Sequence, residues 1–167
     1  MQPLTTPVKP EFPTEETLGV RLATIDELTG LLSRRAFLEQ SDALLKLCQR
    51  QNQNATFVMP DLDKFKAIND QHGHGGGDLV LREFAIFMPG TSLEAALTLL
   101  EKLRSMAENH ITHYHGDTIR TSVSMGVSDT RADSIASISS LSRVSDEALY
   151  RAKSAGGNKV VPAITSL

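Results

Sequence analysis

The most constraining feature of this sequence is a strict alternation of side-chain types between residues 119 and 127. One set of alternate positions is apolar or β-branched, and the positions between them are polar or small. A period of two is expected of a β-strand with two unlike faces. The two sets are Ile119, Thr121, Val123, Met125 and Val127, and Arg120, Ser122, Ser124 and Gly126.

Three other segments have apolar residues at helical spacing and predict amphipathic helices. The segment 34–50 would bury Phe37, Ser41, Leu44, Leu45 and Cys48. A second helix would begin at the capping box Thr91-Ser92-Leu93-Glu94 and bury Leu93, Ala96, Leu97, Leu100, Leu103 and Ala107. The last helix would stop at Gly156-Gly157 and carry Leu141, Val144, Ala148, Leu149 and Ala152.

Two shorter apolar runs predict further strands. Thr56 to Met59 is expected to be a buried strand that ends at Pro60, and Val160-Val161 a short final strand. Strands interleaved with helices predict a single α/β domain, a two-layer sandwich. We place this domain at residues 25–162, after a proline-rich flexible tail of residues 1–24 and before a short tail of residues 163–167.

Composition excludes several classes of protein. Lys and Arg number 17 against 20 Asp and Glu, so no broad basic face is available for nucleic acid. No apolar run approaches the roughly 18 residues that a membrane helix requires. The beginning of the sequence lacks an export-signal pattern, and Cys48 is the only cysteine, so we expect a cytoplasmic protein without an internal disulfide.

Two carboxylates follow the first strand directly. In extended backbone, Asp61 and Asp63 would point to the same side, where their oxygens suit Mg²⁺. For an isolated Asp-x-Asp, ordinary turn or helix-capping chemistry is the favoured interpretation.

The residues that follow favour a ligand site. Gly73 and the run Gly75 to Gly77 allow backbone to approach a ligand closely. Asn69 and Asp78 offer an amide and a carboxylate that suit a purine edge. Asp78 is also a candidate N-cap for a following helix.

This stretch resembles the GGDEF, or diguanylate cyclase, family pattern Asp-x-Asp-x-Phe-Lys-x-x-Asn-Asp-x-x-Gly-His-x-x-Gly-Asp at every specified position from Asp61 to Asp78. Residues 26–34 and 146–153 resemble two further segments of the family, so the likeness covers residues 26 to about 161. It implies a nucleotidyl-cyclase or ferredoxin-like βαββαβ core and an ancestral synthesis of cyclic di-GMP from two GTP.

The resemblance also implies roles for individual residues. Asp61 and the Leu62 carbonyl would bind Mg²⁺, Asn69 and Asp78 would read guanine, and His74 would lie near the sugar. Lys66 and Lys153 would approach the phosphates.

The pattern breaks after Asp78. The family has an Arg-x-x-Asp inhibitory motif and a Gly-Gly-Asp/Glu-Glu-Phe turn in the stretch that follows, and residues 79–91 contain neither. An internal deletion near residues 82–86 would account for this, removing roughly twenty residues by ordinary element lengths. The resemblance implies that the lost turn supplies an acidic ligand to Mg²⁺, for which Glu83 would be a doubtful substitute. Gly157 stands where the family has an arginine.

The deletion would remove one edge strand of the sheet. Residues 79–88 would then form either a short helix followed by a strand at Ile86 to Met88, or one longer helix. An exposed edge strand would favour a homodimer. We expect a catalytically impaired domain that binds GTP weakly; the alternatives are an active diguanylate cyclase and a protein-interaction domain.

Overall fold

The computed structural model describes residues 25–26, 30–65, 67, 70, 84–114, 117–131 and 137–164. The predicted tail of residues 1–24 and residues 165–167 lie outside this set. The chain divides into two compact units, residues 1–37 and residues 38–167. The boundary falls inside helix α2, Arg34–Arg50, whose limits match the prediction.

The described part of the first unit contains a tight reversal of the chain. Ile25 and Leu32 form an isolated antiparallel bridge. Within it, the N–H of Asp26 donates to the carbonyl of Leu31, and the N–H of Gly30 donates to the carbonyl of Asp26. Gly30 has a φ of 68°, which a glycine adopts without steric cost.

The second unit is built on a sheet with the strand order β2-β1-β5-β6 among the described residues. The strands are β1, Ala55–Leu62; β2, Ile86–Pro89; β5, Val123–Asp129; and β6, Val160–Pro162. β1 pairs antiparallel with β2 and β5, and β6 is parallel to β5. A separate antiparallel pair joins β3, Ile111–Tyr114, to β4, Asp117–Arg120.

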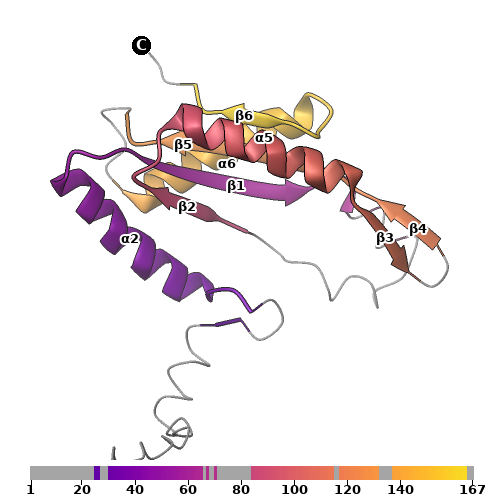
Figure 1. Ribbon diagram of the computed structural model, residues 1–167, viewed down its shortest axis with the longest axis horizontal. Coiled ribbons are helices and arrows are strands. Elements are labelled where there is room, and N and C mark those ends of the chain that lie inside the picture. Colours follow the sequence, from indigo (N-terminus) through magenta and orange to yellow (C-terminus); the bar gives the residue numbers. More distant parts are fainter. Residues whose placement is uncertain are drawn as a thin grey trace, which may run out of the picture. The chain divides into compact units, whose positions relative to one another are not determined.

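Two long helices cover the sheet, α5, Leu93–Asn109, and α6, Ile138–Ser154. Figure 1 shows α5 in front of β1 and β5 and α6 behind them. The mixed class of helices and strands predicted from the sequence is confirmed. Helices on both faces add one layer to the two-layer arrangement that we expected.

The face of the sheet toward α5 is apolar. Alternate residues of β1 and β5 point toward this helix and form one buried cluster with it, consisting of Val58, Val123, Met125, Val127, Ala96 and Leu100. Ile86 and Met88 of β2 pack against the same cluster. This is the hydrophobic core that the alternation in residues 123–127 predicted.

On the face toward α6, β5 carries small side chains instead, namely Ser124, Gly126 and Ser128. A Cβ added at Gly126 would lie 2.0 Å from the carbonyl oxygen of Ser145 and 2.3 Å from the amide nitrogen of Leu149. The helix backbone therefore rests directly on the strand. Ser128 Oγ donates to the carbonyl of Leu141 at 2.9 Å, and Ser145 Oγ donates to the carbonyl of Phe57 at 3.1 Å. Buried hydroxyls thus satisfy carbonyls on both sides of this close contact.

The first strand runs past Pro60, where we predicted its end. Pro60 lies opposite Met125, whose N–H donates to Lys159 on the far side of β5. This is consistent with Pro60 and Met125 forming a pair that exchanges no hydrogen bonds, so Pro60 needs no N–H toward β5. On its other side, β2 pairs with β1 only as far as Val58. The missing donor of proline therefore costs no hydrogen bond at this position.

The alternating run of residues 119–127 is not one strand, as predicted, but two. It changes partner at Thr121 and Ser122, from β3 to β1. The N–H of Asp63 donates to the carbonyl of Ser122 and the hydroxyl of Thr121 donates to the carbonyl of Asp63, so these two residues are held by the end of β1.

Details of the predicted helices also differ. Ser92, not Thr91, is the N-cap of α5, and its hydroxyl accepts from the N–H of Ala95. Leu44 and Leu103 were predicted to be buried, yet they are 39% and 38% exposed. The other predicted limits hold, because α6 ends before Gly156 and Gly157, whose φ angles are both positive.

The structure decides between the two alternatives for residues 79–88. Ile86–Pro89 is a strand, so one continuous helix to Met88 is wrong. Its first residue, Ile86, lies opposite Val58, toward the carboxyl end of β1. The connection from β1 to β2 therefore begins and ends near the same end of the sheet, and no strand crossing the sheet is required between them. Residues 71–83 of this connection lie outside the described set.

Among the described residues, none of the helices is both long enough and apolar enough to cross a membrane.

The close contact at Gly126 makes a direct prediction. Gly126→Ala should lower the free energy of unfolding by about 3 kcal/mol, because the new methyl group collides with helix backbone that has no freedom to rotate away. Urea unfolding followed by circular dichroism measures this, with the exposed Ser154→Ala as a control that should change stability by less than about 0.5 kcal/mol. Equal stability of the two variants would contradict the close packing.

Candidate functional site

The candidate site lies where β1 ends. Asp61 is opposite Ser124 of β5, and Leu62 is opposite Val123. Because side chains alternate along a strand, Asp61 shares the face of Ser124 and Gly126, which α6 covers. The next acidic residue on that face is Asp63, which immediately follows the strand.

The carboxylate of Asp63 is fully engaged in holding the fold. Its two oxygens accept hydrogen bonds from Ser122 Oγ at 2.6 Å, from Ser124 Oγ at 2.6 Å and from the backbone N–H of Asn158 at 2.7 Å. Its own N–H and carbonyl bond to residues 121–122. One side chain thus joins β1, the start of β5 and the segment between α6 and β6.

The predicted pairing of Asp61 with Asp63 did not include this structural role. The available signal was the serine at alternate positions 122 and 124, on the strand face that meets Asp63. Hydroxyl donors at that spacing fit both oxygens of one carboxylate.

Asp61 has a different partner. Its Oδ2 is in contact with the ammonium of Lys153, in the last turn of α6. The side chains are 47% and 39% exposed, so the pair lies at the rim of the fold. Partial burial lowers the pKa of the Lys153 ammonium. The structure therefore brings together two residues that the family resemblance places in one site, although they are 92 positions apart in the sequence.

The segment after α6 explains the glycine at position 157. Gly156, Gly157 and Asn158 have φ angles of 102°, 75° and 53°. A Cβ on Gly157 would lie 2.8 Å from Oδ1 of Asp63, so an arginine here would require Asp63 to move. The position of Asp63 therefore leaves no room for an arginine side chain at residue 157.

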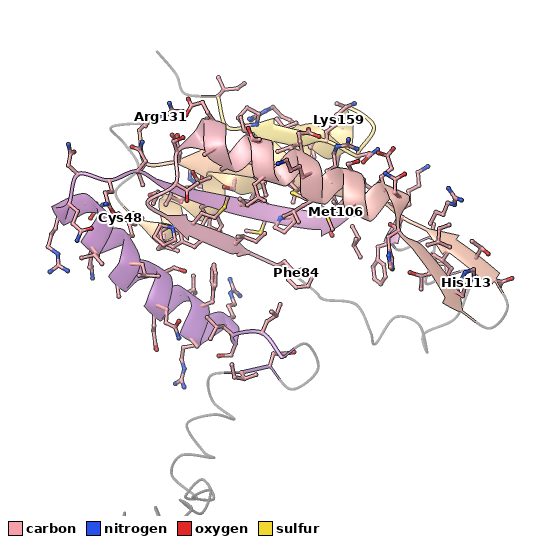
Figure 2. All side chains as sticks on the ribbon, viewed as in Figure 1. Cys48, Phe84, Met106, His113, Arg131 and Lys159 are labelled. Carbon is pink, nitrogen blue, oxygen red and sulfur yellow. The ribbon has the colours of Figure 1, made fainter. Side chains whose placement is uncertain are left out.

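Asn158 ties this segment to α5. Its side-chain oxygen accepts from Arg104 at 2.7 Å, and its amide nitrogen donates to Glu108 at 2.8 Å. Arg104 also pairs with Glu101 and Glu108 along the helix. In Figure 2 the label of Lys159 marks the neighbouring residue.

Five of the predicted site residues lie outside the described set: Lys66, Asn69, His74, Asp78 and Glu83. Their roles in reading guanine, contacting sugar or phosphate, or binding metal stay predictions.

The described residues do not fit a Mg²⁺ site. They contain no group of three or more His, Cys, Asp or Glu side chains able to hold a metal ion. At the end of β1, Asp63 is committed to three donors and Asp61 to Lys153, which leaves the Leu62 carbonyl. Mg²⁺ takes octahedral oxygen coordination, usually keeps several waters, and is bound through one or two carboxylates together with substrate phosphates. These residues, as they are arranged here, do not form such a site.

Comparison with known proteins identifies the family of this chain. The family described as "Diguanylate cyclase, GGDEF domain" matches in two pieces, residues 23–85 and 82–159. The chain belongs to the GGDEF family. The two pieces overlap at residues 82–85, and β2 begins immediately after them.

One relative is the response regulator PleD of Caulobacter vibrioides, which is 34% identical over 86% of this chain and 37% of its own length. The chain thus spans little more than a third of that relative. The alignment runs over 167 positions, whereas 86% of this chain is about 144 residues, so about twenty positions of PleD have no counterpart here.

Two solved structures resemble the GGDEF domain described here. The active GGEEF domain of a diguanylate cyclase from Vibrio cholerae is 28% identical with a TM-score of 0.71, over 80% of this chain and 98% of that one. The coiled coil and GGDEF domain of DgcB from Caulobacter crescentus, in complex with c-di-GMP, gives a TM-score of 0.78 over 87% and 88% of the two chains. At 24% identity the latter likeness concerns the fold alone.

The two aspartates are predicted to differ in their effect on stability. Asp63→Ala should lower the free energy of unfolding by about 2–3 kcal/mol, because it leaves a backbone N–H and two hydroxyls without their acceptor. Asp61→Ala removes only an exposed ion pair and should cost less than about 1 kcal/mol. Urea unfolding of both variants measures the difference, and similar losses would contradict the structural role of Asp63.

Proposed function

We propose that this chain is a GGDEF domain of cyclic di-GMP signalling that binds guanine nucleotide weakly and does not complete its cyclisation. The observation that carries the proposal is the arrangement at the end of β1. There the carboxylate of Asp61 is paired with Lys153, that of Asp63 is committed to the fold, and no Gly-Gly-Asp/Glu-Glu-Phe turn exists in the sequence to add another acid.

The chemistry of the family makes this loss severe. Phosphoryl transfer depends on metal ions that neutralise developing charge and on positioning of the reacting groups. Among the described residues, the two carboxylates at the end of β1 are both engaged, so the first requirement is not met by them. The missing turn affects the second requirement. Glu83 would have to replace the turn to restore activity, which is why an active diguanylate cyclase is the less favoured alternative.

A true internal deletion is supported from two directions. The family matches in two pieces that meet at residues 82–85, and about twenty positions of PleD are unmatched. The antiparallel pairing of β2 with β1 supplies a physical reason why a shorter chain can still fold, since the connection returns near the end where it started.

Nucleotide binding is proposed on the residues that follow β1. Asn69 and Asp78 would read the guanine edge, because a carboxylate accepts from N1–H and N2–H where adenine offers no such pair of donors. His74 would lie near the sugar, and Lys66 and Lys153 near the phosphates. A domain acting on GTP and cyclic di-GMP would work in the cytoplasm.

A second candidate function is a protein-interaction domain. Among the described residues, β2 pairs with β1 on one side and with no strand on the other. Such an edge offers unpaired backbone groups to a strand of another chain, including a second copy of this one.

Nucleotide titration tests the proposed function. We expect the purified protein to bind GTP more tightly than ATP when the two are titrated by calorimetry. Asp78→Ala should abolish this weak binding, since one lost hydrogen-bonding partner costs about 1–3 kcal/mol. Incubation with GTP and Mg²⁺ should give no cyclic di-GMP by chromatography.

The control for this titration is Asp117→Ala, which removes an exposed carboxylate from the first residue of β4. It should bind GTP like the wild type. Equal affinity for GTP and ATP would reject guanine recognition, and metal-dependent product that disappears in Asp61→Ala would reveal an active cyclase.

Light scattering tests the second candidate. If β2 recruits another copy, the wild type should be dimeric at high concentration and Phe87→Lys, which places a charge in the middle of β2, should shift it toward monomer. Circular dichroism checks that the variant remains folded. A wild type that stays monomeric, with the variant behaving identically, would contradict pairing through β2.

A further inference from the structure

The contact between Lys153 and Asp61 is set by the packing of α6 and not only by the reach of a lysine. Residues 145, 149 and 153 are four apart and lie along one side of the helix. The first two are the residues whose backbone rests on Gly126. Lys153 is one step further along the same side.

The spacing of helix and strand brings this step to Asp61. Four helical residues advance about 6 Å, and two strand residues advance about 6.6 Å. Moving from Leu149 to Lys153 therefore corresponds to moving two residues along β5, from Gly126 to Ser124. Ser124 is the residue opposite Asp61 in the sheet. The backbone of Lys153 is thus fixed beside the carboxylate of Asp61 by the contact between Leu149 and Gly126, one helical turn away.

The Lys153 ammonium supplies the positive charge that a metal ion would supply in this position. It places one positive charge against Asp61, which among the described residues is the carboxylate at the end of β1 that the fold does not use. Lysine has three N–H donors, so contact with Asp61 leaves donors for the oxygens of an anionic ligand.

We propose that Lys153 is the counter-ion of Asp61 in place of a divalent cation, so that this lysine and a metal ion compete for one carboxylate. The inference deepens the proposed function in one respect: if guanine nucleotide binds here, its binding does not require Mg²⁺. Lys153 then acts both as the neutralising charge and as a donor to phosphate.

Manganese binding tests the competition directly, without nucleotide. Mn²⁺ is titrated into wild type, Lys153→Met, Asp61→Asn and the double variant, and free ion is measured by electron paramagnetic resonance. Methionine keeps an unbranched side chain of similar length and removes the charge. Thermal unfolding of each variant without metal confirms that it is folded.

We expect wild type and Asp61→Asn to bind Mn²⁺ equally weakly. Lys153→Met should bind at least fivefold more tightly, and the double variant should return to the level of Asp61→Asn. Asp61-dependent binding in the wild type that Lys153→Met does not strengthen would overturn the proposal. So would a gain in Lys153→Met that persists in the double variant, because Asp61 would then not be the ligand.

A nucleotide arm separates this inference from the proposed function. GTP is titrated in buffer with Mg²⁺ and in buffer with a chelator, and the two affinities should agree within about twofold. An affinity at least tenfold higher with Mg²⁺, lost in Asp61→Asn, would overturn metal-independent binding. Failure to bind GTP in either buffer would reject the proposed function, while the manganese titration would still decide the role of Lys153.

Discussion

The structure depends on the direct contact between the backbone of α6 and Gly126. Most helices rest on a sheet through layers of side chains, but here one strand position has no side chain at all and the helix occupies that space. The approach brings Ser145 close enough to bond the carbonyl of Phe57, and Ser128 close enough to bond that of Leu141. Because the register of helix on strand is fixed there, it also determines which residue of the last turn meets the end of β1.

At the end of β1, the two aspartates of one short motif, Asp61 and Asp63, have different roles. Asp61 and Asp63 share a face, yet only Asp63 lies where two serines and a backbone N–H converge. Three donors to one carboxylate make it a structural joint between separate parts of the chain. Asp61, two residues earlier, is exposed at the rim and pairs with the ammonium of Lys153. Of these two aspartates, Asp61 is therefore the one whose carboxylate the fold leaves at the rim.

Much of the fold could be predicted from local pattern. Helical periodicity gave the limits of α2, and glycines marked the end of α6, since both signals lie within the elements themselves. The errors arose where a distant partner decides. Pro60 stays in β1 because Met125 donates elsewhere, and the run 119–127 divides because Asp63 holds residues 121–122. The structural role of Asp63 was hidden for the same reason, as its partners are 59, 61 and 95 residues away.

The buried core and the connection between β1 and β2, where the deletion is proposed, are built from different residues. The buried cluster beneath α5 is built from β1, β5 and α5, with β2 packed against it, and all of these lie outside the short connection. β2 needs only to start near the end where β1 stops, and a connection of any length that returns there can satisfy this. None of the residues of that core belongs to the stretch where the deletion is proposed. The proposed deletion would therefore leave the sheet intact while removing a group that a phosphoryl-transfer site requires. The ammonium of Lys153 then remains as a positive charge at the end of β1.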